Sequence, residues 1–344
     1  MTLEPFRLTR DRILLLDQTL LPSREVWIEI PDAVAMVEAI VSLRVRGAPA
    51  IGIAAALALA IEATRGGDFA GRQTAVDRAG ERLVAARPTA VNLAWAVERV
   101  LRVAHAVASE PGMTAERWAD RIREEAIAIW DEDRAASRAM AEHAASLFPT
   151  ERRFLTHCNT GALATGGGGT ALAALRELHR RRGGGIEIWM TETRPLFQGA
   201  RLTAWELARE GIPGWLIADS AAAHTILREG IEGVLVGADR IARNGDTANK
   251  IGTLGLALAA REAKIPLIVV APSSTVDLSL ESGEGIRIEE RNPAEVTHAG
   301  GVPTAPSGFA ARNPAFDVTP GAWIAAIVTE RGISRGPAHA LGDR

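Results

Sequence analysis

Residues 153–157 form the short apolar run RFLTH, the first of five such runs that decide the fold of the second half of the chain. The other four are IEIWM (186–190), GWLIA (214–218), GVLVG (233–237) and PLIVV (266–270). Each run is continuous enough in apolar residues to be a strand that is buried on both faces of a sheet. Segments with helical periodicity separate the runs, and this alternation predicts a parallel, doubly wound α/β sheet of the Rossmann-like type.

Polar residues follow nearly every one of these runs. They are Cys158-Asn159, Glu192-Thr193-Arg194, Asp219-Ser220, Asp239-Arg240 and Ser273-Ser274. In open parallel sheets, ligands bind at the carboxyl ends of the strands. The sequence therefore predicts a ligand site at this edge of the sheet.

The first half of the chain has a different pattern. Two short β-rich runs within residues 13–30 are separated by Leu21-Pro22-Ser23, which predicts an antiparallel hairpin. Helical periodicity follows, and the break at Gly47-Ala48-Pro49 is expected to begin an alanine-rich helix. We therefore expect a mostly helical N-terminal domain, residues 1–148, that carries the hairpin, and a Rossmann-like catalytic domain, residues 149–344.

The composition excludes several classes of protein. The chain has 344 residues, of which 47% are apolar, enough to fill two cores, so a disordered tail protein is excluded. The 39 basic and 42 acidic residues are well mixed and give a net charge of -3. No field of one sign is then available to hold phosphate backbones or anionic lipid, and we expect no nucleic acid as a partner.

Membrane spans and disulfides are not expected either. The uncharged stretch 47–61 is shorter than the roughly 20 residues that a bilayer requires, and the uncharged stretch 154–175 carries a histidine, an asparagine and a glycine run. The one cysteine, Cys158, cannot form an intrachain disulfide, and the chain begins with charged residues where a signal peptide needs an apolar run. These features favour a cytoplasmic location and no membrane partner.

Cys158 and Asp239 are the candidate catalytic residues at the predicted edge. Cys158 lies just past a strand and before Gly161, where we expect a helix to begin, so backbone N–H groups would favour its thiolate. A buried core cysteine is the alternative. Asp239 ends the run GVLVGA, whose apolar surroundings would favour the protonated acid that acid catalysis near neutral pH needs. An ion pair or a helix cap is the alternative for Asp239.

Three basic side chains are candidate anion ligands. Lys250 is one of only two lysines among the 39 basic residues, and it follows Asn249 at an expected helix start, where a phosphate would fit. Arg46 precedes Gly47-Ala48-Pro49, and the N–H groups of the helix expected there can also bind an anion. Arg87, which precedes a proline, repeats this pattern more weakly. A solvated lysine and arginines in surface ion pairs are the alternatives.

The signals for a metal or a nicotinamide cofactor are weak. Gly166, Gly168 and Ala171 match the spacing G-x-G-x-x-A, but they lie too far past the preceding strand for a dinucleotide-binding turn. The seven histidines form no HExxH motif and no Cys/His ligand spacing. The sequence therefore predicts no metal and no cofactor.

Six motifs in order along the chain resemble those of the methylthioribose-1-phosphate isomerase family. They are RGAPAIG (46–52), ARPTAVNLAW (86–95), THCNTGALAT (156–165), ETRPLFQGARLTAWEL (192–207), GADRIARNGDTANKIGT (237–253) and NPAFDVTP (313–320). The resemblance runs from about residue 15 to residue 332. The larger fold group includes ribose-1,5-bisphosphate isomerases and regulatory subunits of the translation-initiation guanine-nucleotide exchange factor.

The resemblance implies an aldose–ketose isomerase of methionine salvage that works without a cofactor on a small sugar phosphate, usually as a homodimer. It implies that Cys158 is the family's catalytic cysteine and that Asp239 is its general acid. The substrate contacts that it implies are Arg46, Gly47, Ala48, Arg87, Gln198, Asn249 and Lys250. Reasoning from the residues alone selects all of these positions except Gln198.

The chemistry explains why such residues are needed. An aldose with phosphate on its anomeric oxygen is locked as a ring, so isomerisation needs an acid to open the ring while the phosphate stays attached. Asp239 suits that step, and Cys158 as a thiolate could then remove the C2 proton. A direct hydride shift from C2 to C1 would need the same desolvated cavity but no strong base, and the sequence leaves both routes open.

Two alternative functions stay open. Met190, the glycine run 166–169 and the stretch 220–224 depart from the family pattern, which leaves the 5-substituent of the sugar undecided. A 5-deoxyribose 1-phosphate would make nearly the same contacts. A non-catalytic regulatory subunit would share the fold, but it has no reason to keep both Cys158 and Asp239.

Overall fold

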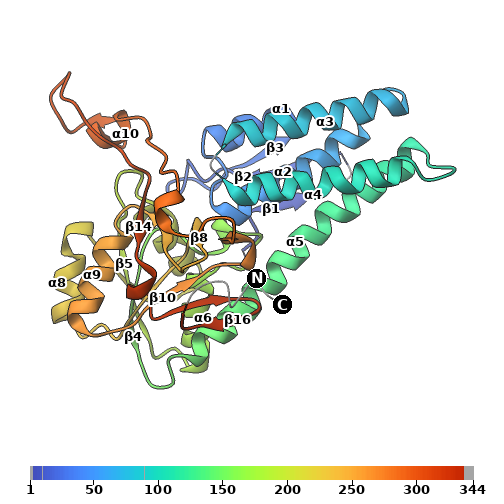
Figure 1. Cartoon of the computed structure of the whole chain (residues 1–344). Helices are drawn as coiled ribbons and strands as arrows, with labels where there is room; N and C mark the ends of the chain where they lie inside the picture. The colour runs from blue at the N-terminus through green and yellow to red at the C-terminus, as the bar shows by residue number, and fades with distance from the viewer. Residues whose placement is uncertain (1–2, 10, 89, 337–344) are drawn as a thin grey trace. The chain divides into compact units, whose positions relative to one another are not determined.

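The computed structural model describes residues 3–9, 11–88 and 90–336, and these residues divide into two compact units (Figure 1). Unit 1 comprises Met1–Ala136 together with Ala162–Gly169, and unit 2 comprises Ser137–Gly161 together with Thr170–Arg344. The predicted domain division after residue 148 stays a prediction, because compactness alone does not test which part of the chain folds independently.

Unit 1 combines a small antiparallel sheet with long helices. The strands are β1 (Phe6–Leu8), β2 (Ile13–Leu16) and β3 (Trp27–Ile30), and the helices are α1 (Ala33–Val41), α2 (Ala48–Thr64), α3 (Phe69–Ala86), α4 (Val91–Ala108) and the first part of α5 (Ala115–Ser146). Strands β2 and β3 pair antiparallel, with Ile13 level with Ile30, which confirms the predicted hairpin. Strand β1 adds a third strand that the sequence did not reveal.

Helix α2 is the centre of unit 1. All its residues from Ala50 to Ile61 are buried, and it packs against α3 and α4. It begins after Gly47, as predicted, with a proline in its first turn. Gly47 has a φ of +104°, and a Cβ at this position would lie 2.6 Å from the Cα of Ala164. Only glycine permits both this conformation and this close approach.

Unit 2 is built on a mainly parallel sheet of seven strands. Their spatial order is β16 (Gly332–Ser334), β15 (Ala326–Thr329), β10 (Leu267–Val270), β7 (Gly233–Val236), β4 (Arg153–Thr156), β5 (Glu187–Thr191) and β6 (Gly214–Ile217). All neighbours pair in parallel except β15 and β16. The five runs that the sequence identified as strands are therefore confirmed, whereas β15 and β16 were missed.

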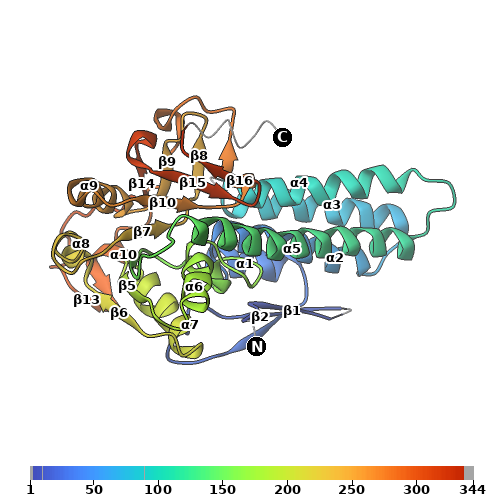
Figure 2. The same cartoon turned by 90° about the horizontal axis from the view of Figure 1, so that it is seen from below.

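Helices cover both faces of this sheet. Figure 2 shows α8 (Ala222–Arg228) and α9 (Thr253–Ala263) on one side of the strands and α6 (Ala171–Arg181) on the other. Leu155 of β4 belongs to the apolar cluster that α8 and α9 complete. Phe154, which precedes it, points to the other face and meets Phe148 with ring centres 5.0 Å apart. This alternation follows from the two-residue period of a strand.

The prediction that every strand is buried on both faces is wrong for β6. Trp215 is 58% exposed and Leu216 is 50% exposed. Strand β6 is the last strand of the sheet, so it has a neighbour on one side only. The ring of Trp215 stacks on that of Trp189 of β5, with centres 5.5 Å apart.

A second sheet in unit 2 was not predicted. It contains β11 (Val276–Asp277), β8 (Arg240–Ala242), β9 (Thr247–Lys250) and β14 (Phe316–Thr319), in that spatial order. A short hairpin of β12 (His298–Ala299) and β13 (Val302–Pro303) follows the helical turn α10 (Ala294–Thr297). Among residues 3–9, 11–88 and 90–336, no helix combines the length and the apolar character that crossing a membrane requires.

Candidate active site

Cys158 lies two residues past the end of β4 in a left-handed backbone conformation. Its φ is +64°, which non-glycine residues seldom adopt and which costs on the order of 1–3 kcal/mol. Its N–H donates to Thr193 Oγ1 at 2.9 Å, and its carbonyl accepts from Thr203 Oγ1 at 2.6 Å. The residue is buried, with 8% of its surface exposed. Two hydroxyl groups thus hold a strained cysteine, an arrangement that is typical of functional sites.

The segment that follows β5 is held in a similar way. Thr193 and Phe197 also have positive φ values, +63° and +57°. The carboxylate of Asp219, which follows β6, accepts from the N–H of Thr193 at 2.7 Å and from the N–H of Arg194 at 2.6 Å. The polar residues that were predicted to gather at the strand ends therefore do contact one another there.

Asp239 lies three residues past the end of β7, the strand that pairs in parallel with β4. A Cβ on Gly237 would lie 3.0 Å from Cγ2 of Thr160, so the chain that leads to Asp239 packs against the chain that follows Cys158. Asp239 itself is half-buried. The structure thus brings the two predicted catalytic residues to neighbouring strand ends at one edge of the sheet.

His157 is a buried residue that sequence reasoning did not select. Its Nε2–H donates to the carbonyl of Ile251 at 2.8 Å, and its Nδ1 accepts from Thr191 Oγ1 at 2.6 Å. A carbonyl can only accept, which fixes the tautomer. Burial lowers the pKa of His157, although the bond to Ile251 opposes that shift. The neutral imidazole therefore joins the end of β5 to the segment that carries Lys250. The only sign of this role in the sequence was a histidine at the end of a buried strand.

Asn249 and Lys250 lie on β9, where the sequence predicted a helix start. Lys250 Nζ donates to the carbonyl of Ala315 at 2.9 Å and lies 4.6 Å from the centre of the Phe316 ring. Asn249 Nδ2 donates to Oγ1 of Thr253, the first residue of α9, at 2.9 Å. Pairing of β9 with β14 thus fixes both predicted substrate ligands just before α9.

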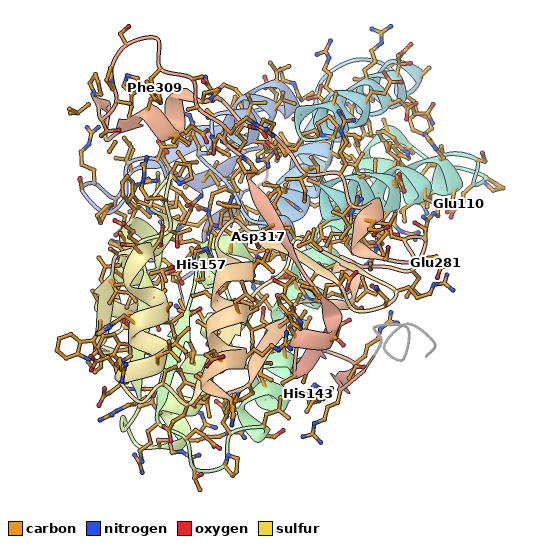
Figure 3. The ribbon with its side chains drawn as sticks, turned by 60° about the vertical axis from the view of Figure 1, so that its left-hand side comes forward. Glu110, His143, His157, Glu281, Phe309 and Asp317 are labelled. Atoms are coloured by element: carbon orange, nitrogen blue, oxygen red, sulfur yellow. The ribbon has the colours of Figure 1, made fainter. Side chains whose placement is uncertain are left out.

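Asp317 of β14 caps helix α9 (Figure 3). Its carboxylate accepts from the N–H of Gly252 at 2.7 Å and from the N–H of Leu254 at 3.0 Å. A phosphate held by Lys250 would therefore not use these two N–H groups, contrary to the expectation of an anion at the helix start. Burial raises the pKa of Asp317 to about 6, although the two N–H bonds and Lys250 oppose this shift.

The pKa of Asp317 leads to a prediction for stability. Its folded pKa of about 6 lies above the ordinary value of 3.8, so the native state holds this proton more tightly than the unfolded state does. The contribution of Asp317 to stability is complete below pH 4 and is lost as the pH rises through 6. The free energy of unfolding of the Asp317→Asn variant, relative to the parent, should therefore rise by up to roughly 3 kcal/mol over this range.

Urea unfolding of both proteins at pH values between 4 and 7 would measure this difference. Both proteins keep His157, so its own titration cancels in the comparison. The weaker cap in the variant adds a constant offset and no slope. A difference that does not change with pH would contradict the raised pKa of Asp317.

The predicted site residues are divided between the two units. Unit 1 contains Arg46, Gly47, Ala48 and Arg87, and unit 2 contains Cys158, Gln198, Asp239, Asn249 and Lys250. Arg46 Nε donates to Oε1 of Gln18 at 3.2 Å, and Ala48 is the first residue of α2. Arg87 directly follows the last residue of α3. The segment Ala162–Gly169, which contacts Gly47 within unit 1, begins four residues after Cys158 along the chain.

Gln198 is the one implied ligand that carried no sequence signal of its own. It directly precedes the π-helix η2 (Gly199–Thr203) and is 6% exposed. Its Oε1 is buried and has no hydrogen-bond partner among the described residues. A Cβ on Gly199 would lie 1.8 Å from the carbonyl oxygen of Thr191, so only glycine lets η2 pack on the end of β5. This packing fixes the position of Gln198.

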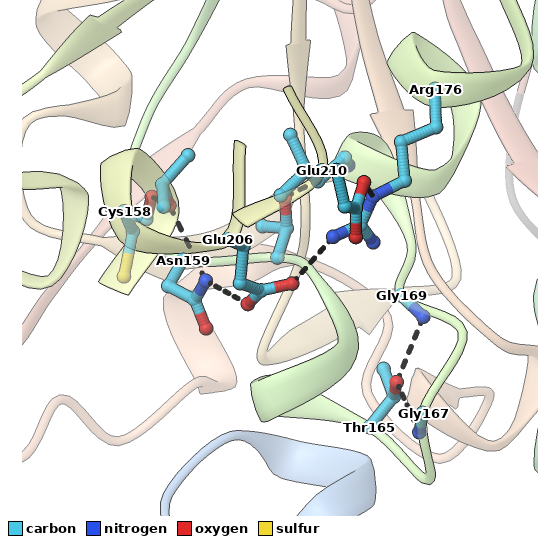
Figure 4. Close-up of polar contacts among 11 residues, drawn as sticks. Cys158, Asn159, Thr165, Gly167, Gly169, Arg176, Glu206 and Glu210 are labelled. Carbon is cyan, nitrogen blue, oxygen red and sulfur yellow. Dashed lines mark hydrogen bonds and ion pairs between the residues drawn. The ribbon is translucent and has the colours of Figure 1, made fainter. Parts of the chain in front are cut away.

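The helix that was expected to begin near Gly161 does not form there. The three-residue turn η1 (Ala162–Ala164) and the glycine run follow instead, and α6 begins at Ala171. The start of α6 lies 13 positions past Cys158 along the chain, and the N–H of Leu172 in its first turn donates to Oγ1 of Thr160 at 3.1 Å. The effect of α6 on the Cys158 thiol stays a prediction. The N–H groups of Gly167 and Gly169 donate to Oγ1 of Thr165 at 3.3 and 2.8 Å (Figure 4), so the chain itself uses them.

Clusters of metal-binding side chains are absent from the part of the chain that the structure describes. No three His, Cys, Asp or Glu side chains lie close enough together there to hold a metal ion.

Residues 44–336 match the model of the Initiation factor 2 subunit family, which is well over half of the chain. The chain belongs to this family. Its fold is accordingly a mixed α/β fold with a parallel sheet, as the strands of unit 2 show.

Named relatives are similar over almost the whole chain. The chain is 49% identical over 328 residues to a methylthioribose-1-phosphate isomerase from Geobacter metallireducens, covering 95% of this chain and 94% of the relative. It is 51% identical over 325 residues to a 5-deoxyribose 1-phosphate isomerase from Moorella thermoacetica, covering 94% and 92%. The crystal structure of 5-methylthioribose 1-phosphate isomerase from Pyrococcus horikoshii OT3 matches with a TM-score of 0.89 and 40% identity, over 96% and 92% of the two chains. These matches confirm the resemblance seen in the six motifs.

Proposed function

We propose that this protein is an aldose–ketose isomerase that converts 5-methylthioribose 1-phosphate into 5-methylthioribulose 1-phosphate in methionine salvage. The observation that carries the proposal is the strained backbone of Cys158, which hydrogen bonds to two threonine hydroxyls hold in place. Cys158 follows β4, and Asp239 follows β7, the strand that pairs with β4. Relatives named methylthioribose-1-phosphate isomerase, which are 49% and 52% identical to this chain over 95% of its length, support the proposal.

In the proposed mechanism Asp239 opens the ring. Its carboxylic acid gives a proton to the ring oxygen as the bond between that oxygen and C1 breaks, while the phosphate stays on C1. The resulting carboxylate then takes the proton of the C2 hydroxyl, which becomes the ketone. The hydrogen on C2 moves to C1, either as a proton by way of the Cys158 thiolate or directly as a hydride. Both routes return Asp239 to its acid form and leave no net change in protons.

The basic side chains and Gln198 are proposed to hold the substrate. Lys250, Arg46 and Arg87 are suited to the phosphate, because ammonium and guanidinium groups donate charge-assisted hydrogen bonds to phosphate oxygens. The buried Oε1 of Gln198 can accept from a sugar hydroxyl, which would satisfy an acceptor that the chain leaves unpaired among its described residues. Asn249 lies beside Lys250 on β9 and is proposed to contact the substrate as well.

A related sugar is the second candidate substrate. The relative from Moorella thermoacetica, named for 5-deoxyribose 1-phosphate, is as similar to this chain as the relatives named for methylthioribose 1-phosphate. The two sugars share the phosphate and the ring hydroxyls, so they differ only at the group on C5. Selectivity would then rest on the part of the pocket that surrounds C5.

A magnetic-resonance time course tests the proposed function. The purified protein is incubated with methylthioribose 1-phosphate, or with 5-deoxyribose 1-phosphate, and proton and phosphorus spectra are followed. A ketose 1-phosphate should appear, faster from the methylthio sugar. Faster conversion of the deoxy sugar would select the second candidate. No conversion of either sugar would contradict the isomerase assignment and favour a non-catalytic subunit of the same family.

The finer architecture is proposed on the same basis. In the large sheet, β5 and β6 follow on one side of β4, and β7, β10 and β15 follow on the other side, an order that supports a doubly wound, Rossmann-like domain. A homodimer is proposed because Trp215 and Leu216 leave apolar surface exposed at the β6 edge. Light scattering should then give twice the chain mass of 36.5 kDa.

The single cysteine supports a cytoplasmic location, which cell fractionation would test.

A further inference from the structure

Glu206 is a fully buried carboxylate close to Cys158 that the proposed mechanism does not use. It lies on α7 (Ala204–Arg209) and is 0% exposed. Its Oε2 accepts from Arg176 Nη2 of α6 at 2.7 Å, and its Oε1 accepts from Asn159 Nδ2 at 2.7 Å (Figure 4). Asn159 directly follows the strained Cys158, so the hydrogen bond to Asn159 joins a buried carboxylate to the turn that carries the thiol.

The backbone also fits closely over this carboxylate. A Cβ on Gly161 would lie 2.1 Å from Glu206 Oε2, so the chain crosses the carboxylate at a distance that only glycine permits. Three residues before Glu206 in the chain, Thr203 accepts from Asn159 Nδ2 at 3.4 Å and donates to the carbonyl of Cys158 at 2.6 Å. One short segment of the chain therefore contacts the turn from Cys158 to Gly161 at several points.

The chemistry of the two neighbours requires a carboxylate between them. The guanidinium of Arg176 and the amide nitrogen of Asn159 are both donors, so the group that joins them must accept on both oxygens. Burial alone would lower the pKa of Arg176, but the carboxylates of Glu206 and Glu210 outweigh it and raise the pKa, which keeps the guanidinium charged. A glutamine at position 206 offers one acceptor only and would turn an N–H towards a donor.

We propose that Glu206 is a positioning residue for the reaction, which acts through Asn159 to hold Cys158 in its left-handed conformation. The left-handed backbone is costly for cysteine and persists only when surrounding contacts impose it. Thr193 and Thr203 hold the peptide groups of Cys158 itself, and Glu206, anchored by Arg176, holds the next residue. The proposal rests on the proposed role of Cys158 in catalysis.

Glu210 provides a matched control. It accepts from Nε of the same Arg176 at 2.6 Å, in an ion pair like that of Glu206, whereas the bond from Asn159 Nδ2 goes to Glu206. The Glu206→Gln and Glu210→Gln variants therefore both remove one charge beside Arg176. They differ in whether the contact to Asn159 is disturbed, which separates a positioning role from a general loss of an ion pair.

The steady-state kinetics of these variants test the proposal. We expect Glu206→Gln to lower kcat by about 10- to 100-fold, because a small misplacement of a reacting group costs about this much, with KM within about twofold of the parent. Glu210→Gln should keep both parameters within about twofold of the parent. An equal fall in kcat in both variants, or no fall in Glu206→Gln, would overturn the proposal.

Asn159→Ala breaks the same contact from the other side and leaves the pair of Glu206 with Arg176 in place. Asn159→Ala should lower kcat to a similar extent. The double variant with Glu206→Gln should be no slower than the slower single variant, because both substitutions remove the same contact. Effects that multiply in the double variant would overturn the proposal. Where Glu206→Gln does not fold, parent-like kinetics of Asn159→Ala would overturn it instead.

Alkylation of Cys158 gives a readout that needs no substrate. Because the chain has a single cysteine, the rate of reaction with iodoacetamide reports on this thiol alone. Loss of the contact to Asn159 should loosen the turn and raise the rate by about 10-fold in Glu206→Gln and Asn159→Ala, but not in Glu210→Gln. If the parent converts neither sugar phosphate, the proposed function is wrong, but the alkylation test still applies. Alkylation rates in Glu206→Gln and Asn159→Ala that equal the parent's would show that Glu206 does not position the thiol.

Discussion

Replacing Asp239 with asparagine should abolish turnover while substrate binding stays largely intact. The amide keeps the shape of the side chain but cannot give a proton to the ring oxygen, so the ring stays closed. General acid catalysis by a positioned group contributes about 100- to 10,000-fold, and we expect kcat to fall by at least about 1,000-fold. The Kd of the sugar phosphate, measured by calorimetry, should change by no more than a few-fold.

An exposed carboxylate gives the control for this prediction. Asp131 on α5 is 62% exposed and pairs with Arg134, so Asp131→Asn makes the same change of side chain at a position that is not one of the proposed site residues. It should match the parent in kcat and in Kd. An active Asp239→Asn variant would end the assignment of Asp239 as the acid, and a variant that no longer binds substrate would assign Asp239 to binding instead.

Replacing Cys158 with alanine should also remove activity, and the fate of the C2 hydrogen should show why. A thiolate that removes this hydrogen as a proton contributes about 100- to 10,000-fold, so the alanine variant should lose activity on that scale. Substrate deuterated at C2 is followed by proton magnetic resonance with the parent protein. Loss of the label to water would identify the proton route, and transfer of the label to C1 would identify the hydride route.

The Cys158→Ser variant provides the comparison for this experiment. Serine keeps the size of cysteine and the bonds of its backbone to Thr193 and Thr203, but its hydroxyl is a much weaker acid than a thiol. If the thiolate is the base, serine should be nearly as inactive as alanine. A Cys158→Ala variant as active as the parent would contradict any role of the thiol.

The strands that carry the site could be predicted because their signal is local. Mostly apolar runs of five residues identified β4, β5, β6, β7 and β10, and a parallel sheet places the following residues at one edge. Strands β8, β9 and β14 were missed because they are short and carry polar residues such as Asn249 and Asp317. Their pairing, which fixes Lys250 and caps α9, depends on contacts between segments more than 60 residues apart.

The sequence by itself determined the alternation of five parallel strands with helices and the edge of the sheet at which Cys158 and Asp239 lie. These features follow from periodicity and from the connections that parallel strands require. Only the tertiary structure decided that β6 is an exposed edge, that Cys158 is left-handed, and that Glu206 contacts Asn159. The reason is physical: the bonds that hold this turn join residues 35, 45 and 47 positions apart, and no local pattern in the sequence records such a pairing.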